Sequence, residues 1–395
     1  MKLRNTEDMV MRQMGVEEEL MLVDPESGVL RAVANAALAA HEVRMRGHVD
    51  HDADDEFGAD AGMGDELFQQ QIETGTTPCR TADDLRRDLV ECRQEAAGSA
   101  ADAGAALVAV GTPVLPQGEQ ARVTRKDRYE RIVHEFGEIS RQGSVCGMHV
   151  HVDVVDDDEG VRVIDRLRPW LPVLRAMSVN SPYWRGADTG YASWRSQVWA
   201  RWPTAGPSDP FGDPAGYQAA VDALIGSGAA IDVGMLYFDA RLSQSYPTVE
   251  VRVFDTMTEP DDVVLLAVLS RALVSTLASD DPEGDFSSDG WRHEMLRAAH
   301  WRASRDGLSD ELLNPRDGHR LPARTVLENL VTFVRPALED TDDLVHVRDG
   351  LNQLLARGTG ASRQRAAFER GGLEEVAGDL RRRFDATVDG ATASN

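Results

Sequence analysis

Apolar and polar residues alternate along three segments of the chain, and this alternation predicts three β-strands at 14–23, 149–154 and 248–254. In each segment one set of alternate positions is mainly valine, leucine or another apolar residue, and the other set carries charged or histidine side chains. Successive side chains of a strand point to opposite faces of its sheet. We therefore expect one face of the sheet to pack on helices and the other to be polar.

Longer segments carry the apolar spacing and end signals of helices. The clearest is 81–103, where Thr81 is suited to cap the N-terminus and Asp83 and Asp84 lie in the first turn. Further helices are predicted at 161–177 and 261–278. From about residue 291 onwards the chain should be mainly helical, with breaks at Pro315, Pro322, Pro336 and 358–360.

The remaining segments are predicted as short strands or as loops. Strands are expected at 66–74 and 107–110, an exposed acidic loop at 50–64, and a long irregular connection at 180–216. Because strands and helices follow each other without a regular βαβ rhythm, the predicted fold class is α+β with a mainly antiparallel sheet and flanking helices. We expect one catalytic domain over 1–395, of which 285–395 is a mostly helical C-terminal portion.

Composition narrows the range of partners. The formal net charge is −25, from 42 Lys plus Arg against 67 Asp plus Glu, and no basic stripe is present, so nucleic acid binding is not expected. The most apolar run, 263–269, is too short to cross a bilayer. Cys79, Cys92 and Cys146 form no C-x-x-C pair and the N-terminal segment lacks a signal peptide pattern, so a cytoplasmic location is predicted.

The polar positions of the three alternating strands carry the candidate chemistry. Strand periodicity groups Glu17 with Glu19, His149 with His151 and Asp153, and Glu250 with Arg252. Charges at this density on a strand face are usually paired, metal-bound or in solvent. Glutamate oxygens suit magnesium, and an arginine fork suits phosphate or carboxylate. The pattern favours phosphoryl transfer on the sheet itself, since the sequence contains no P-loop.

Simpler readings of the same residues stay open at this point. Glu17 and Glu19 could form a solvated strand face, and Glu250 and Arg252 could be cross-strand ion-pair partners. Cys146 is interpreted as a packed residue, and the tryptophans between Trp184 and Trp202 as either core or a substrate lid. Two other functions remain: a metal-dependent hydrolase with zinc on His149 and His151, and a nucleotide-binding homologue without turnover.

Several motifs in fixed order resemble those of the type 2 glutamate-cysteine ligase family. They are GVEEEL at 15–20, Glu66 followed by QIET at 71–74, CGMHVHV at 146–152, NSPYWRG at 180–186, Thr189-Gly190, SWR at 193–195, TVEVR at 248–252 and GTGASRQR at 358–365. The match extends from about residue 12 to residue 370. Any single motif would be a weak signal, and the preserved order makes the resemblance specific.

This resemblance implies a glutamine synthetase-like catalytic fold and an ATP- and Mg²⁺-dependent carboxylate-amine ligase with weak glutamate-cysteine ligase activity. It implies small amino acid substrates and allows a homodimer. By position, the metal ligands would be Glu17, Glu19, Glu66, Glu73, His149 and Glu250. The residues acting in catalysis would be Arg252, Glu73 and His149, and those binding ATP or substrate would be Arg195, Arg252, Arg363 and Arg365.

Overall fold

A seven-stranded antiparallel sheet forms the centre of the computed structural model, which describes residues 11–46, 62–116, 122–141, 144–279, 288 and 290–392. The strands lie in the order β2-β3-β1-β5-β9-β8, and β4 pairs with the C-terminal half of β1. The bounds of these strands are β1 (Met14–Val23), β2 (Gly62–Asp65), β3 (Gln71–Gly75), β4 (Ala106–Val108), β5 (Gly147–Asp153), β8 (Ala240–Leu242) and β9 (Thr248–Asp255). Two small hairpins lie outside this sheet: β6 (Tyr183–Trp184) with β7 (Ala187–Asp188), and β10 (Glu311–Leu313) with β11 (Arg320–Pro322).

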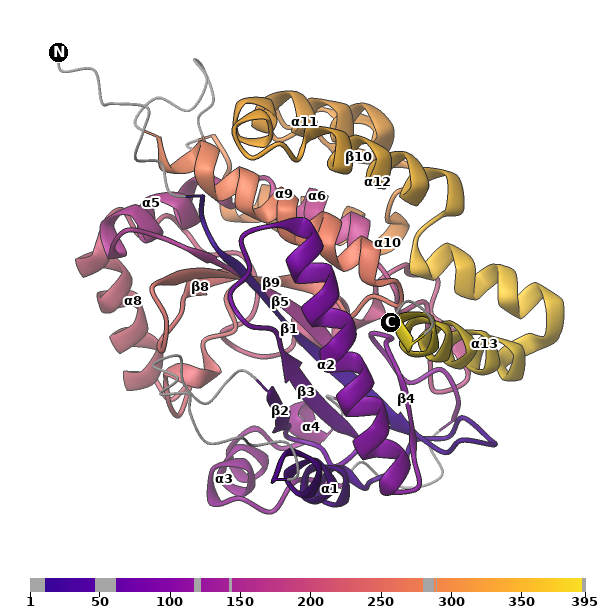
Figure 1. Cartoon of the computed structure of the whole chain (residues 1–395). Helices are drawn as coiled ribbons and strands as arrows, with labels where there is room; N and C mark the ends of the chain where they lie inside the picture. Colours follow the sequence, from indigo (N-terminus) through magenta and orange to yellow (C-terminus); the bar gives the residue numbers. More distant parts are fainter. Residues whose placement is uncertain are drawn as a thin grey trace, which may run out of the picture.

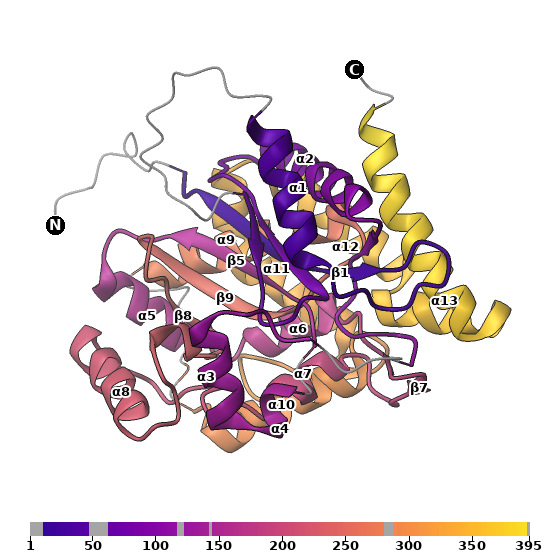
Figure 2. The ribbon, with the colours of Figure 1, turned by 90° about the horizontal axis from the view of Figure 1, so that it is seen from below.

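Helices surround the sheet, and the long strands β1, β5 and β9 lie side by side among them (Figure 2). Their bounds are α1 (Ala34–Arg46), α2 (Ala82–Asp102), α3 (Asp127–Phe136), α4 (Glu138–Arg141), α5 (Asp157–Leu167), α6 (Leu171–Ser178), α7 (Trp194–Trp199), α8 (Pro214–Gly226), α9 (Pro260–Ala278), α10 (His293–Asp306), α11 (Ala323–Asp340), α12 (Leu344–Arg357) and α13 (Gly360–Thr392). Helices α2 and α9 cross the sheet, and α11 and α12 form a further layer against α9 (Figure 1). The predicted α+β class with a mainly antiparallel sheet is confirmed.

The apolar face of the sheet makes the main core. The alternate valines of β5 and β9, including Val150, Val152, Val249 and Val251, are fully buried in one cluster with residues of α5, α6 and α9. Because these valines occupy every second position, the intervening histidine, glutamate and arginine side chains must emerge on the opposite face. This division of faces, read from the sequence, positions the candidate site.

Several predicted elements agree closely with the structure. Strand β1 has the predicted bounds, and Thr81 caps α2 by accepting a hydrogen bond from the Asp84 backbone N–H. The strand predicted at 107–110 is present as β4, and α9 covers the segment predicted at 261–278. The C-terminal portion is mainly helical, and the short hairpin β10–β11 interrupts it.

Other boundaries were wrong. Residues 66–70 form a bend and a turn before β3 rather than part of a strand. The helix predicted at 161–177 is divided into α5 and α6, and Pro336 lies inside α11 without ending it. The connection at 180–216 contains a hairpin and helix α7. Of the predicted acidic loop, Gly62–Asp65 is strand β2, and 50–61 lies outside the described residues.

On the apolar face, β1 carries a buried ion pair that the sequence analysis did not foresee. Arg93 of α2 donates two hydrogen bonds to the Glu18 carboxylate, at 2.6 and 2.8 Å, and others to the backbone carbonyls of Met257 and Thr258. Both side chains are completely buried. The pair ties α2 to β1 and to the segment that leads into α9.

Replacing Arg93 with alanine should destabilise the protein by about 3–5 kcal/mol, because the Glu18 charge would stay buried without a partner. Urea unfolding measures this. Arg86→Ala on the same helix is the matched control, since its ion pair with Asp261 is more than half exposed and should contribute at most about 1 kcal/mol. Equal midpoints for the two variants would contradict the role given to Arg93.

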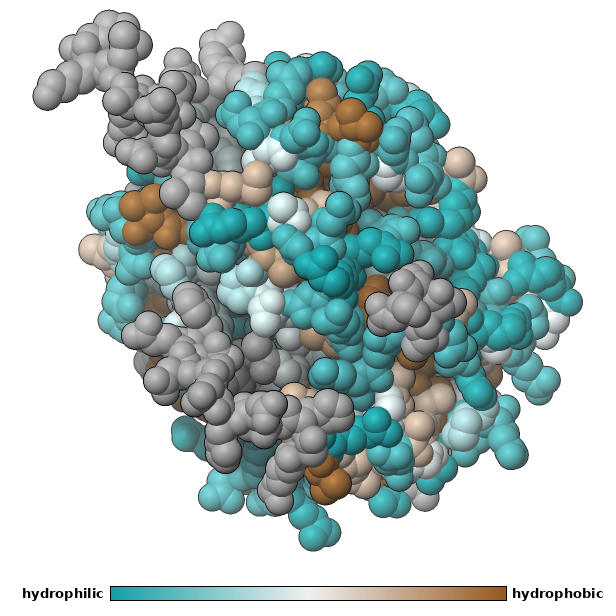
Figure 3. Space-filling view, viewed as in Figure 1, coloured by the Kyte–Doolittle hydropathy of each residue, from teal (hydrophilic) through white to brown (hydrophobic). Residues whose placement is uncertain are grey.

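The surface is polar on the face shown in Figure 3, where hydrophobic side chains form small separate groups among hydrophilic ones. Within the described part of the chain, no helix has the length and apolarity needed to cross a membrane.

Candidate active site

A polar cavity of about 510 Å³ opens on the charged face of the sheet. Six of the residues singled out in the sequence line it: Glu17, Glu19, Glu66, Glu73, His149 and Arg252. Four carboxylates, one histidine and one arginine from separate parts of the chain therefore face one space.

Strand pairing explains how residues so distant in sequence meet. In the antiparallel register, Glu19 of β1 lies opposite Glu73 of β3, and Glu17 lies opposite His149 of β5. Directly opposed residues of neighbouring strands have their side chains on the same face. Glu66 joins them from the turn before β3, where Thr124 Oγ donates a 2.6 Å hydrogen bond to the Glu66 backbone carbonyl.

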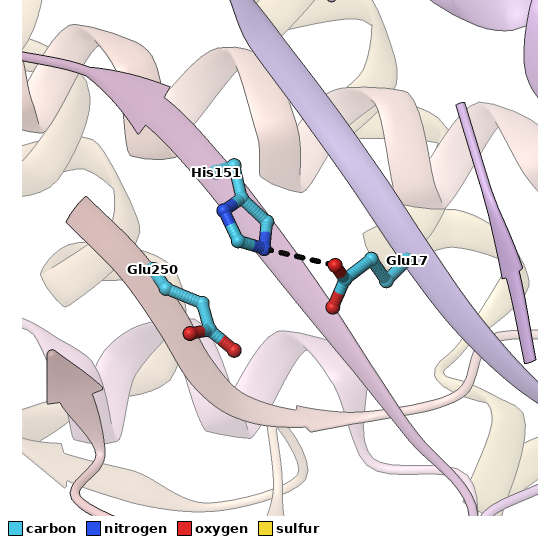
Figure 4. Close-up of side chains that lie close together, drawn as sticks. All are labelled: Glu17, His151 and Glu250. Carbon is cyan, nitrogen blue, oxygen red and sulfur yellow. Dashed lines mark ion pairs between the residues drawn. The ribbon is translucent and has the colours of Figure 1, made fainter. Parts of the chain in front are cut away.

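Glu17 connects two groups of potential metal ligands. Its carboxylate lies 3.0 Å from His149 Nδ1 and 3.3 Å from His151 Nε2. Figure 4 shows Glu17, His151 and Glu250 converging from the adjacent strands β1, β5 and β9. Ligand atoms lie within 4.8 Å of one another in two sets, Glu17 with Glu73 and His149, and Glu17 with His151 and Glu250. His149 and His151 belong to different sets.

The carboxylates are held in an environment that disfavours their charge. Burial, followed by repulsion from Glu19, raises the pKa of Glu66 to about 8. Burial and the nearby Glu66 likewise raise the pKa of Glu73 well above its usual value. Glu17 differs from them. Burial acts to raise the pKa of Glu17, but hydrogen bonds from His149 and His151 bring this pKa well below its usual range.

A bound cation would suit these carboxylates. Among the described residues, Glu19, Glu66 and Glu73 have no arginine, lysine or histidine at ion-pair distance. Clustered buried carboxylates are stable as anions when they coordinate a cation, and hard divalent cations prefer oxygen ligands. The donor set of this cavity therefore fits magnesium.

Arg252 lies at the positive side of the cavity. Its Nη1 forms an ion pair with Glu250, which also accepts from Arg241 Nε at 2.5 Å. Burial and the neighbouring Arg241 lower the pKa of Arg252 to about 9, so it stays a cation near neutral pH. His149 Nδ1 lies 3.4 Å from Arg252 Nη1. Burial of the imidazole and the positive charge of Arg252 lower the pKa of His149 to about 3. His149 is therefore neutral and can donate to Glu17 from Nδ1.

The family model described as "Glutamate-cysteine ligase family 2 (GCS2)" matches residues 13–386. The chain belongs to glutamate-cysteine ligase family 2. A relative from Frankia alni, named "Putative glutamate--cysteine ligase 2-2", is 47% identical over 369 residues, covering 93% of this chain and 96% of the relative.

Solved structures share the glutamate-cysteine ligase fold with this family member. A bifunctional glutathione synthetase from Pasteurella multocida matches with a TM-score of 0.70 at 17% identity. The match covers 95% of this chain but about half, 52%, of that longer chain. Glutamate–cysteine ligase from Francisella tularensis, solved in complex with AMP, matches with a TM-score of 0.63 at 12% identity, covering 97% and 94%.

Arg195, which the family resemblance placed at substrate or ATP, lies buried behind the cavity wall. It is in the first turn of α7, where Ser193 caps the helix, and its guanidinium lies over the Trp199 ring. A Cβ atom at Gly147 would overlap that guanidinium. The Gly147 backbone N–H in turn donates a 2.6 Å hydrogen bond to Glu19. Glycine at 147 therefore allows Arg195 to approach the Glu19 end of the site.

Gly147→Ala should displace Arg195 and lower ligase activity about as much as Arg195→Ala does, because the added methyl group takes the space of the guanidinium. Steady-state kinetics of both variants and of the double variant measure this. The double variant should be no slower than either single one, since both changes remove the same interaction. Additive losses would contradict the link.

Arg363 and Arg365, which the family resemblance placed at ATP or substrate, do not line the cavity. Both lie on α13, away from the cavity: Arg363 pairs with Glu259 at 2.7 Å, and Arg365 pairs with Asp188 at 3.0 Å. Each guanidinium joins α13 to a neighbouring segment. Glu250 also lies just outside the cavity lining and contacts it through Arg252 and His149.

Sequence reasoning missed other residues that line the cavity. Helix α3 contributes Arg128 and Tyr129, and Tyr237 and Arg241 come from the region before and in β8. Arg128, Tyr129 and Tyr237 lie outside the sheet, so tertiary packing brings them to the site. Arg241 instead reaches it from β8, where it lies opposite Glu250 of β9. Trp199 and Trp202 also line the cavity, so the tryptophan-rich segment forms part of its wall.

Cys146 is fully buried and accepts a 3.3 Å hydrogen bond from Gln71, as expected of a packed thiol.

Proposed function

We propose that this family member is an ATP-dependent carboxylate-amine ligase that activates glutamate as an acyl phosphate and joins it to an amino group, with weak glutamate-cysteine ligase activity. The observation that carries this proposal is the meeting of Glu17, Glu19, Glu66, Glu73 and Arg252 in one cavity. The free cysteines are compatible with the cytoplasm as its location.

In this proposal magnesium is held by the carboxylates Glu17, Glu19, Glu66, Glu73 and Glu250, with His149 beside them. When bound, it supplies positive charge that offsets the charge of the ATP phosphates. The two ligand sets that share Glu17 support this assignment.

The chain's own residues then orient the reaction. An oxygen of the substrate carboxylate attacks the γ-phosphorus of ATP, the bond to the β-phosphate oxygen breaks, and ADP leaves. Arg252 stabilises the charge spread over the transferring phosphoryl group, and Arg195, behind the cavity wall, supports the negative charge of Glu19. The amine next attacks the acyl phosphate, its proton is lost, and phosphate leaves with the carboxylate oxygen.

Two observations weigh against the rival functions. A zinc hydrolase built on His149 and His151 would need both imidazoles at one ion, but they fall in different ligand sets among the described residues. A homologue without turnover would be free to lose its acidic residues, yet the four cavity carboxylates and Arg252 are all present.

The test is ADP release across a panel of amino acids paired with amines, with and without magnesium. We expect ADP to appear with glutamate plus an amine, cysteine among them, and only when magnesium is present. Equal ADP release without an acid substrate, or catalysis that needs zinc and ignores ATP, would overturn the proposal.

A further inference from the structure

Asp255 forms a buried polar centre that the mechanism above does not use. It is the last residue of β9, the strand that also carries Arg252, and only 1% of its surface is exposed. Among the described residues, its carboxylate has hydrogen bonds but no ion pair. A buried carboxylate is costly to keep ionised without a cationic partner, so its presence at this position calls for an explanation.

Three hydrogen bonds join Asp255 to two segments that precede α7. Its Oδ2 accepts a 2.6 Å hydrogen bond from Ser181 Oγ and a 2.9 Å hydrogen bond from the Asn180 backbone N–H. Its Oδ1 accepts a 2.8 Å hydrogen bond from Ser193 Oγ. Because a hydroxyl has one hydrogen, a serine that donates to Asp255 offers only lone pairs to other groups. Asp255 thus fixes both serine hydroxyls as acceptors.

Both acceptors hold the first turn of α7. Ser181 Oγ accepts a 3.0 Å hydrogen bond from the Arg195 backbone N–H. Ser193 Oγ accepts a 3.3 Å hydrogen bond from the Ser196 backbone N–H. These N–H groups are among those that a helix leaves without partners at its start. A continuous set of contacts therefore leads from β9 through Asp255 and the two serines to Arg195.

The side chain of Arg195 has few polar contacts of its own. Within the part of the chain that the structure describes, its guanidinium forms neither a hydrogen bond nor an ion pair, and the residue is only 2% exposed. It fills the space above Gly147 of β5, and Gly147 lies opposite Asp255 of β9. Burial raises the pKa of Asp255, and the positive charge of Arg195 opposes that rise. Asp255 is therefore suited both to hold the helix of Arg195 and to balance its charge.

We propose that Asp255 is a positioning residue of the ligase reaction, which holds α7 so that Arg195 stays beside Glu19. The proposal rests on the proposed function and deepens it, since it names what fixes Arg195 behind the cavity wall. Asp255 is not among the residues that line the cavity. Its effect should therefore appear in kcat, through Arg195 and Glu19, and not in the binding of ATP or of the acid.

Asp255→Asn tests this, because asparagine keeps the shape of the side chain but loses its charge, and its amide nitrogen donates instead of accepting. We expect kcat for ADP release to fall by about 10–100-fold, the scale of a small misplacement close to a reaction centre. KM for ATP and for glutamate should change by less than about twofold. When Arg195→Ala is already present, Asp255→Asn should cost less than about twofold more, because both changes remove the same interaction.

Two further variants support this experiment. Asp343→Asn is the matched control, because Asp343 is also a buried carboxylate, pairs with Arg271 and lies outside the cavity lining. It should lower the thermal midpoint and leave kcat and both KM values as in the wild type. Ser193→Ala decides the question if Asp255→Asn does not fold. It removes one of the three hydrogen bonds and should lower kcat by about 2–10-fold, with the same dependence on Arg195.

The outcomes separate this inference from the proposed function. If the wild-type protein releases no ADP with any acid and amine, the proposed function fails and the role given to Asp255 fails with it. If the wild type releases ADP but Asp255→Asn and Ser193→Ala keep its kcat, only the inference is overturned. Losses that multiply when Asp255→Asn and Arg195→Ala are combined, or a rise in KM at constant kcat, would also overturn it, since Asp255 would then act independently of Arg195.

Discussion

Arg252→Ala is expected to reduce ADP formation by roughly 1,000-fold, the scale on which arginines stabilise a transferring phosphoryl group. Arg252 is a largely buried arginine that lines the cavity and faces its carboxylates. Its loss should leave the fold intact, because Glu250 keeps its ion pair with Arg241 at 2.5 Å. Single-turnover measurement of ADP, with thermal unfolding as a check on folding, tests the prediction.

Two controls sharpen the Arg252 experiment. Arg252→Lys keeps a charge but loses the planar fork, so it should recover only part of the rate. Arg128→Ala removes another arginine of the cavity lining, one that is 42% exposed and paired with Asp232, and should have a much smaller effect. A rate for Arg252→Ala close to that of Arg128→Ala would remove Arg252 from the mechanism.

Glu17→Gln is expected to raise the magnesium concentration needed for half-maximal activity by about 10–100-fold. Glu17 belongs to both ligand sets, and glutamine keeps its size while removing the negative charge. The measurement is a magnesium titration of ADP release at saturating ATP. Glu130→Gln, an exposed change on nearby α3, should leave the titration as in the wild type. An unaltered titration for Glu17→Gln would show that this carboxylate does not hold the metal.

Much of the site was predictable because it is built on strands. The two-residue period of 14–23, 149–154 and 248–254 separates valines from charged residues, and the structure keeps that separation. Periodicity gives the face of each residue but not which strands are neighbours. The pairing of Glu17 with His149 and of Glu19 with Glu73 follows from sheet order, which no local pattern encodes.

The rest of the site depends on packing between distant segments. Glu66 reaches the cavity from a turn, and the turn is held by Thr124, 58 residues later in the chain. Arg128 and Tyr129 reach the cavity from helix α3. This helix is amphipathic, as surface helices commonly are, so its sequence alone did not indicate a site. Arg363 and Arg365 fit the family motif, but α13 directs them to Glu259 and Asp188. The motif alone does not show that these two arginines lie outside the cavity lining.

The fate of the substrate's carboxylate oxygen tests the central claim most directly. Glutamate labelled with oxygen-18 in its side-chain carboxylate is incubated with ATP, magnesium and an amine that supports ADP release, and the released phosphate is analysed by mass spectrometry. If an acyl phosphate forms in this cavity, one labelled oxygen appears in phosphate for each ADP produced. Phosphate that is released with ADP but carries no label would contradict the account.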